Sequence, residues 1–274
     1  MESSRRRRAV ASTRCLILAS ILALQSASAV RSETRSTDEI DACIRKNRPA
    51  ESSVLTISFR SKDRFGAVTE KSGTLSWKRF DNDLSRIVLR FQYPSDVRGS
   101  AILLIEAKER APEMFMCLPA LQKVRRVTTH MVSSSMFGTD FSYEDFQRLQ
   151  GYTSSAAKLR LEDAVVAERP AFVVERTLGT DSGSAYERIV DFIDQETCLP
   201  LRIESYERGG RLRKVLSADP AAFELSGSVW VAKSLLMRDL LDETETSLLV
   251  EKIEIDTRIK KKVFSMRDLD ARCR

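Results

Sequence analysis

The stretch EMFMCLPALQKVRRVTTHMVSSSMFGTDFSYEDFQ, residues 113–147, decides the fold of this chain. It begins with an apolar run at residues 114–118, which predicts a buried strand. Pro119 ends that strand, because proline has no N–H to donate to a neighbouring strand. A basic run at residues 123–126 and a serine-rich connection follow. The stretch closes on an apolar segment and a short predicted helix that begins at Ser142.

The segment after the serines is unusually apolar for a loop. Loops normally lie at the surface and are polar. This segment instead carries one methionine and four aromatic residues: Met136, Phe137, Phe141, Tyr143 and Phe146. Two interpretations are open. These side chains either plug the end of a β-rich core, or they line or cover an apolar cavity.

Alternating apolar and polar residues recur at regular spacing elsewhere and predict an antiparallel sheet. The remaining strands are expected at residues 54–59, 73–80, 85–93, 101–107, 158–166, 171–178, 185–193, 199–207, 212–216, 229–237 and 245–255. Charged residues alternate with apolar ones along them, which is typical of a solvated sheet face. A helix is expected over residues 37–48, capped by Thr37 or Asp38, with Ile40 and Ile44 on one face. Asp268 and Leu269 are expected to end the ordered part.

Residues 1–29 predict an export signal. Arginines at positions 5–8 precede an apolar run at residues 15–24, and Ala27-Ser28-Ala29 has the small-x-small pattern of a cleavage site. The apolar run is shorter than the about 20 residues of a membrane-spanning helix. Cleavage near Ala29 would leave residues 30–274, which no linker rich in Pro, Gly or Ser divides, as a single domain.

The signal accounts for most of the positive charge. The whole chain has 45 basic and 39 acidic residues, net +6. The signal holds five arginines and Glu2, so 45 minus 5 leaves 40 basic residues and 39 minus 1 leaves 38 acidic ones, net +2. Nucleic-acid-binding proteins need a stronger basic excess, so the sequence argues against that class.

The sequence lacks the residue patterns of an enzyme or a metal site. The single histidine, His130, lies near Ser133–Ser135, but no G-x-S-x-G motif is present, so an esterase is only a remote alternative. One histidine without a C-x-x-C pair supplies no zinc ligand set. Ser142 with Asp145 three residues later is typical of a capping box at the start of a helix. This structural role explains the neighbouring acids Glu144 and Asp145 better than a catalytic pair of carboxylates does. We predict a non-enzymatic protein without a catalytic residue, metal or cofactor.

Four cysteines remain after cleavage: Cys43, Cys117, Cys198 and Cys273. In an oxidising compartment they allow three pairings, and the sequence does not choose between them. A Cys43–Cys273 bond is the preferred hypothesis because it would tie both chain ends to the body of the protein. Cys117 is equally compatible with a free buried thiol.

Three motifs, in this order, resemble one protein family. They are PSDVRG at residues 94–99, LPALQKVRR at 118–126 and FGTDFSYED at 137–145, with weaker similarity at 190–194 and 199–201. The family is that of the periplasmic outer-membrane lipoprotein-sorting proteins, related to the LolA and LolB carriers. The resemblance covers most of the mature chain. It departs at Phe115 and Cys117, where family members often have Trp and Tyr.

The resemblance implies a mainly β (α+β) fold, a single antiparallel, half-open β-barrel with short helices covering its mouth. A curved sheet closed by a lid leaves a cavity. The implied function is a periplasmic carrier that holds the acyl chains of a lipoprotein or lipid and supports their transfer toward the outer membrane. The candidate lining and lid residues are Phe115, Met116, Leu118, Met136, Phe137, Phe141 and Tyr143.

Two further expectations concern partners. Lys123, Arg125 and Arg126 are candidates for contact with an anionic lipid headgroup or an acidic partner surface, and a solvated strand face is the alternative. Similar proteins often accompany inner-membrane exporters of the resistance-nodulation-division type. The alternative function is therefore a periplasmic accessory or interaction module of such an exporter, with transient membrane contact.

Overall fold

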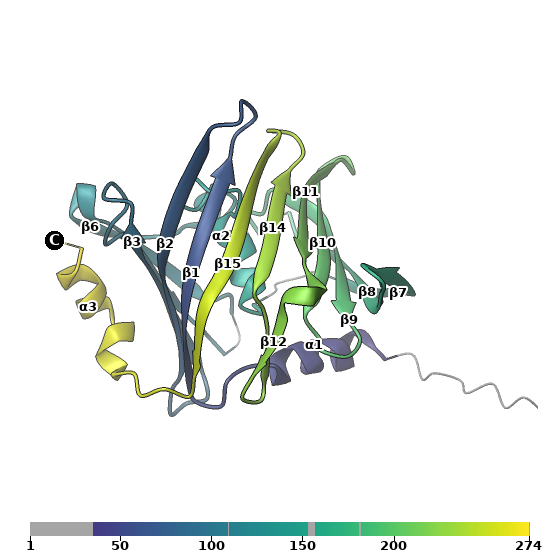
Figure 1. Cartoon of the computed structure of the whole chain (residues 1–274), viewed down its shortest axis with the longest axis horizontal. Helices are drawn as coiled ribbons and strands as arrows, with labels where there is room; N and C mark the ends of the chain where they lie inside the picture. The colour runs from purple at the N-terminus through teal and green to yellow at the C-terminus, as the bar shows by residue number, and fades with distance from the viewer. Residues whose placement is uncertain (1–34, 109, 153–156, 181, 274) are drawn as a thin grey trace, which may run out of the picture. The chain divides into compact units, whose positions relative to one another are not determined.

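Thirteen strands form one antiparallel sheet in the computed structural model, which describes residues 35–108, 110–152, 157–180 and 182–273. The predicted signal and its cleavage site lie outside these residues. The strand order is β6-β5-β4-β3-β2-β1-β15-β14-β11-β10-β9-β8-β7. β1 (Ser52–Lys62) pairs with β15 (Thr244–Ile255) and so joins the two halves of the sheet (Figure 1). β6 (Lys123–Arg126) and β7 (Ala157–Val166) are its two edges, so the sheet is a half-open barrel, as predicted.

The other strands of the large sheet overlap the predicted ranges, although β2 begins five residues earlier than predicted. They are β2 (Val68–Arg79), β3 (Ser85–Tyr93), β4 (Ala101–Ile105), β5 (Glu113–Leu118), β8 (Arg169–Thr177), β9 (Tyr186–Asp194), β10 (Pro200–Glu207), β11 (Leu212–Ala218) and β14 (Ser234–Asp239). β12 (Phe223–Ser226) and β13 (Val229–Ala232) form a separate two-stranded hairpin. The helices are α1 (Thr37–Lys46), α2 (Tyr143–Leu149) and α3 (Met266–Ala271), with short 3₁₀ turns at Pro119–Leu121, Thr129–Met131, Pro220–Ala222 and Lys261–Phe264.

The two faces of the sheet pack against different elements because successive side chains of a strand point to opposite sides. Leu104 belongs to the main cluster of buried residues on the inner, concave face, which also holds Phe59 and Phe141. Leu103, one residue earlier, belongs to a second cluster on the outer face, where it packs with Phe264 and with Leu269 of α3. A third cluster joins Ile40 of α1 to β8 and β9.

Gly73 allows the sheet to bend between β2 and β3. The register of this strand pair shifts between Ser72 and Gly73. A Cβ atom at position 73 would lie 2.3 Å from the carbonyl oxygen of Arg90. Only glycine fits such a close approach of two backbones, and an irregularity of this kind increases the local bend of a strand.

Several local predictions need correction. Ser36, rather than Thr37 or Asp38, caps α1, and it forms a capping box with Glu39. The strand predicted over residues 229–237 is two strands, β13 and β14. Lys233 lies between them, where its N–H donates to the carbonyl of Ala222, just before β12, and its carbonyl accepts from the N–H of Val250 in β15. β12 and α3 were not predicted, and α3 extends the ordered chain beyond Leu269.

Two disulfides join distant parts of the chain. Cys43 of α1 bonds to Cys198, which precedes β10, and Cys117 of β5 bonds to Cys273, which follows α3. The predicted Cys43–Cys273 pair is therefore wrong, and Cys117 is not a free thiol. The two chain ends attach to different places: α1 packs on β8 and β9, whereas α3 packs on the outer face of β4 and β6.

Candidate functional site

The structure brings six of the seven predicted lining residues together in the inner core. Met116, Met136, Phe141 and Tyr143 are buried there, and Leu118 and Phe137 pack against them. The ring of Phe137 lies 4.9 Å from that of Phe91. Phe115 lies apart from the six. It packs with the outer cluster beneath α3, because it precedes Met116 on β5 and points the opposite way.

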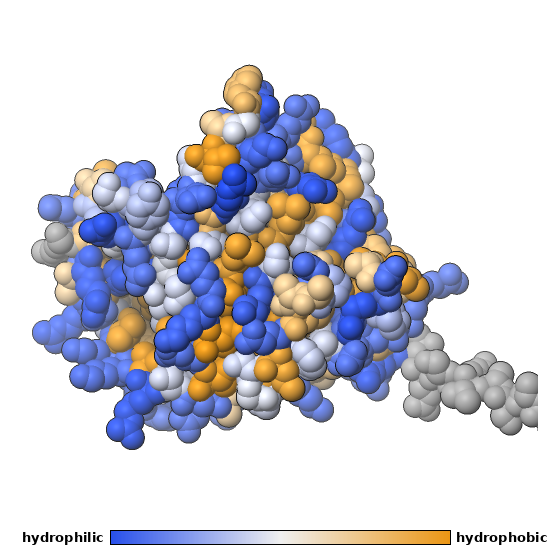
Figure 2. Space-filling view, viewed as in Figure 1, coloured by the Kyte–Doolittle hydropathy of each residue, from blue (hydrophilic) through white to orange (hydrophobic). Residues whose placement is uncertain are grey.

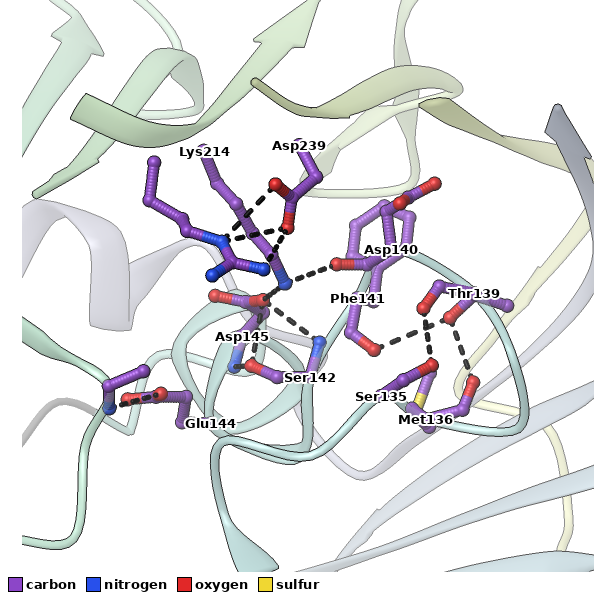
Figure 3. A network of polar contacts seen from close by, with 12 residues as sticks. Ser135, Met136, Thr139, Asp140, Phe141, Ser142, Glu144, Asp145, Lys214 and Asp239 are labelled. Atoms are coloured by element: carbon purple, nitrogen blue, oxygen red, sulfur yellow. Dashed lines mark hydrogen bonds and ion pairs between the residues drawn. The ribbon is translucent and has the colours of Figure 1, made fainter. Parts of the chain in front are cut away.

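Hydrogen bonds attach the apolar loop to the sheet (Figure 3). Lys214 Nζ donates to the Asp140 carbonyl oxygen at 2.6 Å, and the Asp140 N–H donates to Thr246 Oγ1 at 3.0 Å. Inside the loop, Ser135 Oγ donates to the Thr139 carbonyl at 2.7 Å, and the Met136 N–H donates to the Phe141 carbonyl at 2.8 Å. This geometry favours a plug at one end of the core. A role as a mobile lid stays a prediction.

The predicted capping box at the start of α2 is present. Ser142 Oγ accepts from the Asp145 N–H at 3.1 Å, and the Ser142 N–H donates to Asp145 Oδ2 at 2.9 Å. Lys214 and Arg148 each place a nitrogen 3.5 Å from the Asp145 carboxylate. Asp145 is therefore fixed by a cap and two cations, which is a structural role for a buried acid.

Glu144 is the acid in this region with a raised pKa. Its carboxylate accepts a hydrogen bond from Ser184 Oγ at 2.5 Å and from the Ala185 N–H at 3.2 Å. Burial raises the pKa of the Glu144 carboxyl above its ordinary value, Arg148 opposes that rise, and the charge of Asp145 adds to it. Folding thus shifts the Glu144 carboxyl toward its protonated form relative to the unfolded chain.

This raised pKa predicts a pH-dependent effect of Glu144→Gln. A raised pKa in the folded state means that wild type loses stability as the pH rises from the ordinary value of 4.5 through the raised one. Glutamine does not titrate. The free energy of unfolding of the variant, relative to wild type, should therefore increase over this interval and then level off, as measured by urea unfolding between about pH 4 and pH 8. Glu251→Gln, at an exposed position of β15, should show no such increase. A flat difference for Glu144→Gln would contradict the assignment.

An apolar cavity of about 240 Å³ lies between the inner face of the sheet and two covering elements, which are α1 with the segment after it and the β12–β13 hairpin. The sheet contributes side chains of β1, β2, β14 and β15, and α2 contributes its C-terminal end. The lining residues are Ile44, Asn47, Arg48, Pro49, Ser53, Leu55, Ile57, Leu75, Trp77, Leu149, Gln150, Gly151, Cys198, Leu199, Pro200, Val229, Trp230, Val231, Ala232, Leu235, Leu248, Val250 and Ile255.

The two covers are held in different ways. α1 is bound covalently to the body by the Cys43–Cys198 disulfide. The β12–β13 hairpin is attached to the segment after α1 by a pair of hydrogen bonds: Asn47 Nδ2 donates to the Trp230 carbonyl at 3.1 Å, and the Trp230 N–H donates to Asn47 Oδ1 at 2.7 Å. The hairpin is therefore the cover that can move without breaking a covalent bond.

None of the seven predicted lining residues lines this cavity. The loop is bonded to Thr246 near the start of β15, whereas the cavity reaches Ile255 at the end of that strand. The sequence did not indicate that Trp77 and Trp230 line one cavity, because they lie on β2 and β13, far apart in the chain. One wall of the cavity could have been inferred from the apolar residues Leu55 and Ile57, which alternate along β1 and point to the same face of the sheet.

The predicted basic residues lie on the edge strand β6. Lys123 and Arg125 are exposed, and Arg126 pairs with Glu113 at 3.3 Å. Arg126 also lines a second, polar cavity of about 410 Å³ together with Glu144 and Arg148.

The remaining chemistry-bearing residues form no reactive site in the described part of the chain. His130 is exposed in the turn Thr129–Met131. Within the described ranges, no cluster of His, Cys, Asp and Glu has the geometry to hold a metal. Nor does any helix there have the length and apolar character to cross a membrane.

The half-open sheet, its plugged end and its covering helices define a LolA-like fold. An outer membrane lipoprotein-sorting protein domain from Vibrio parahaemolyticus is 23% identical, with a TM-score of 0.75 over 85% of this chain and 97% of that one. A DUF1329 family protein from Desulfovibrio piger is 22% identical, with a TM-score of 0.77 over 84% and 96%. A LolA superfamily protein from Nitrosomonas europaea is 18% identical, with a TM-score of 0.64 over 85% and 99%.

The chain belongs to the family described as "Uncharacterized protein", whose model matches residues 83–271. No curated protein matches the sequence. The structural similarities confirm the predicted fold and its predicted resemblance to LolA-like proteins. At these identities they establish the fold alone, so the ligand has to be argued from the cavity.

Proposed function

We propose that this protein is a non-enzymatic periplasmic carrier that binds the acyl chains of a lipoprotein or lipid and supports their transfer toward the outer membrane. The observation that carries the proposal is the apolar cavity between the sheet and its two covers, lined by Trp77, Trp230 and aliphatic side chains. The similarity in fold to a lipoprotein-sorting protein domain is consistent with it. The predicted export signal would deliver the chain to the periplasm.

Burial of hydrocarbon supplies the affinity in this proposal. Each CH₂ group removed from water contributes about 0.8 kcal/mol. The cavity of about 240 Å³ is smaller than most pockets for drug-sized ligands, which span about 300–1,000 Å³. A long acyl chain therefore requires a cover to move outward. We propose that the β12–β13 hairpin moves, because Asn47 holds it by two hydrogen bonds whereas a disulfide fixes α1.

The predicted loop and basic residues take supporting roles in the proposal. Met136, Phe137 and Phe141 close the end of the core away from the covers, and Met116, Leu118 and Tyr143 support them. Phe115 supports the same strand from its outer face. The exposed β6 edge, with Lys123, Arg125 and Arg126, is positioned to meet an anionic headgroup or an acidic partner surface.

The test compares two tryptophan substitutions at neighbouring positions of β15. Leu248 lines the cavity, whereas Leu249 is 46% exposed on the outer face, where apolar side chains show over β15 (Figure 2). Leu248→Trp should fill the cavity and remove bound lipid, and Leu249→Trp should not. The measurement is mass spectrometry of organic extracts from the purified proteins, with thermal unfolding as a check that both variants fold.

The wild type should release lipid in an amount close to one equivalent per chain. Lipid retained at the wild-type level in a folded Leu248→Trp variant would place the ligand elsewhere. A lipid-free wild type would contradict the carrier proposal and favour the alternative, a periplasmic accessory of an exporter of the resistance-nodulation-division type.

A further inference from the structure

A small cavity adjoins the apolar cavity behind α1; most of its wall is apolar, and we call it the small polar cavity because buried charged side chains also line it. Its volume is about 80 Å³. Five residues line both cavities: Ile44, Leu149, Gly151, Cys198 and Pro200. The small cavity adds four charged and largely buried side chains, Asp41, Arg148, Arg176 and Asp191. Buried charged groups thus lie at one end of the apolar space, an arrangement that matches an amphiphile.

Three buried atoms of this polar end have no hydrogen-bond partner among the described residues. They are Arg176 Nη1, Arg148 Nε and Asp191 Oδ1. The Arg176 side chain is 2% exposed and that of Asp191 is 6% exposed. Buried polar atoms are nearly always hydrogen-bonded in folded proteins, since leaving them unpaired is costly. A group that occupies this space should therefore accept hydrogen bonds from the guanidinium groups and donate one to the carboxylate.

The buried charges at this end are already paired, and Arg45, the remaining charged residue of the lining, is exposed. Arg176 Nη2 donates to Asp41 Oδ1 at 2.7 Å, and Arg176 Nε donates to Asp191 Oδ2 at 2.5 Å. Asp41 also pairs with Lys158, and Arg148 pairs with Asp145. An anionic headgroup would add an uncompensated negative charge to this buried network, and a cationic one would add a positive charge beside two guanidinium groups. Either is unfavourable in a desolvated site.

We propose that the ligand of the apolar cavity is an acyl amphiphile with an uncharged head that carries hydroxyl or amide groups, and that this head lies in the small polar cavity against Arg148, Arg176 and Asp191. Hydroxyl and amide groups both donate and accept hydrogen bonds, as the three unpartnered atoms require. The inference rests on the proposed function, because it names the head of a ligand whose chain occupies the apolar cavity. Acylglycerols and N-acyl amides share this chemistry.

The experiment measures how four lauroyl-chain probes displace an apolar fluorescent dye, phenylnaphthylamine, from the full chain. The uncharged probes are monolauroylglycerol and lauroyl ethanolamide, and the charged probes are laurate and dodecylammonium. At least one uncharged probe should displace the dye at about tenfold lower concentration than either charged probe, which corresponds to the gain from one or two hydrogen bonds. Displacement by only one of the two uncharged probes would identify whether the head is a glyceride or an amide.

Two variants remove the unpartnered atoms, and a third is the matched control. Asp191→Asn and Arg148→Met should each reduce the preference for the uncharged head to within about threefold, because the first replaces the unused acceptor with an amide donor and the second removes an unused donor. Arg45→Met changes a residue that lines the same cavity but is exposed and has no unpartnered buried atom, so it should keep the preference. If Asp191→Asn does not fold, the result for Arg148→Met tests the proposal. We expect Arg148→Met to fold, because Asp145, which loses Arg148 as a partner, still contacts Lys214 and Ser142.

The outcomes separate this inference from the proposed function. Equal or tighter displacement by laurate, or a preference that survives in both variants, overturns the uncharged-head assignment while dye displacement still supports a carrier. A wild type that neither binds the dye nor carries extractable lipid overturns the carrier proposal itself, and the headgroup assignment with it.

Discussion

Replacing Cys43 and Cys198 together with serine is expected to lower the free energy of unfolding by about 3–5 kcal/mol. The bond joins residues 155 positions apart, and closing so long a loop removes much of the conformational freedom of the unfolded chain. It is also the covalent attachment of α1, one of the two covers of the cavity. Urea unfolding of the double variant beside wild type, without reductant, measures the loss.

The other disulfide supplies the matched comparison. Replacing Cys117 and Cys273 with serine should cost a similar amount, since its loop of 156 residues is nearly the same. The two double variants should differ locally. Hydrogen exchange should become faster in α1 when Cys43 and Cys198 are changed, and faster in α3 when Cys117 and Cys273 are changed. A peptide map without reductant that links Cys43 to Cys273 would refute the observed pairing.

Arg176→Met is expected to lower the free energy of unfolding by about 3–5 kcal/mol. Arg176 pairs with Asp41 and Asp191, and all three side chains are largely buried. Removing the guanidinium leaves two carboxylates without their main partner in a desolvated site. Burial raises the pKa of Asp41, but hydrogen bonds from Arg176 and Lys158 outweigh this and lower it. Its contribution to stability is therefore present above the ordinary value of 3.8 and is lost as the pH falls through the lowered one.

A rescue and a control make this prediction specific. The triple variant Arg176→Met with Asp41→Asn and Asp191→Asn should recover much of the loss, because it leaves no unpaired carboxylate in the buried site. Arg60→Met breaks the Arg60–Glu70 pair, whose side chains are 59% and 65% exposed, and should change the free energy of unfolding by less than about 1 kcal/mol. Urea unfolding at neutral pH provides all three values. Equal losses for Arg176→Met and Arg60→Met would show that the buried pairs do not stabilise the fold.

The elements that the sequence predicted well are those defined by local patterns. Ser142 and Asp145 lie three residues apart, and the structure forms the capping box that this spacing indicates. The same pattern at Ser265 and Asp268 begins α3 and would have predicted it. The apolar and polar alternation of residues 54–59 likewise predicted the strand that the structure forms there as β1.

The cavity could not be predicted in this way because its parts come from distant segments. Asn47 meets Trp230 across 183 positions, and no local pattern encodes that contact. The positions of the charged residues were also predicted incorrectly in one place. Charged residues on strands were interpreted as a solvated face, yet Arg176 on β8 is 2% exposed, since Asp41 of α1 covers it. A periodic pattern shows which side a residue faces and does not show whether another element lies there.

The half-open sheet carries a risk that closed barrels avoid, namely self-association through its free edges. An edge strand offers unpaired N–H and C=O groups that can recruit a strand from another molecule and start aggregation. Here β6 has only four residues, three of them cationic, and β7 carries four charges at Lys158, Arg160, Glu162 and Asp163 with an irregular register near them. Short length, charge and a bulge are known protections against edge-to-edge pairing. They allow the sheet to stay open without polymerising.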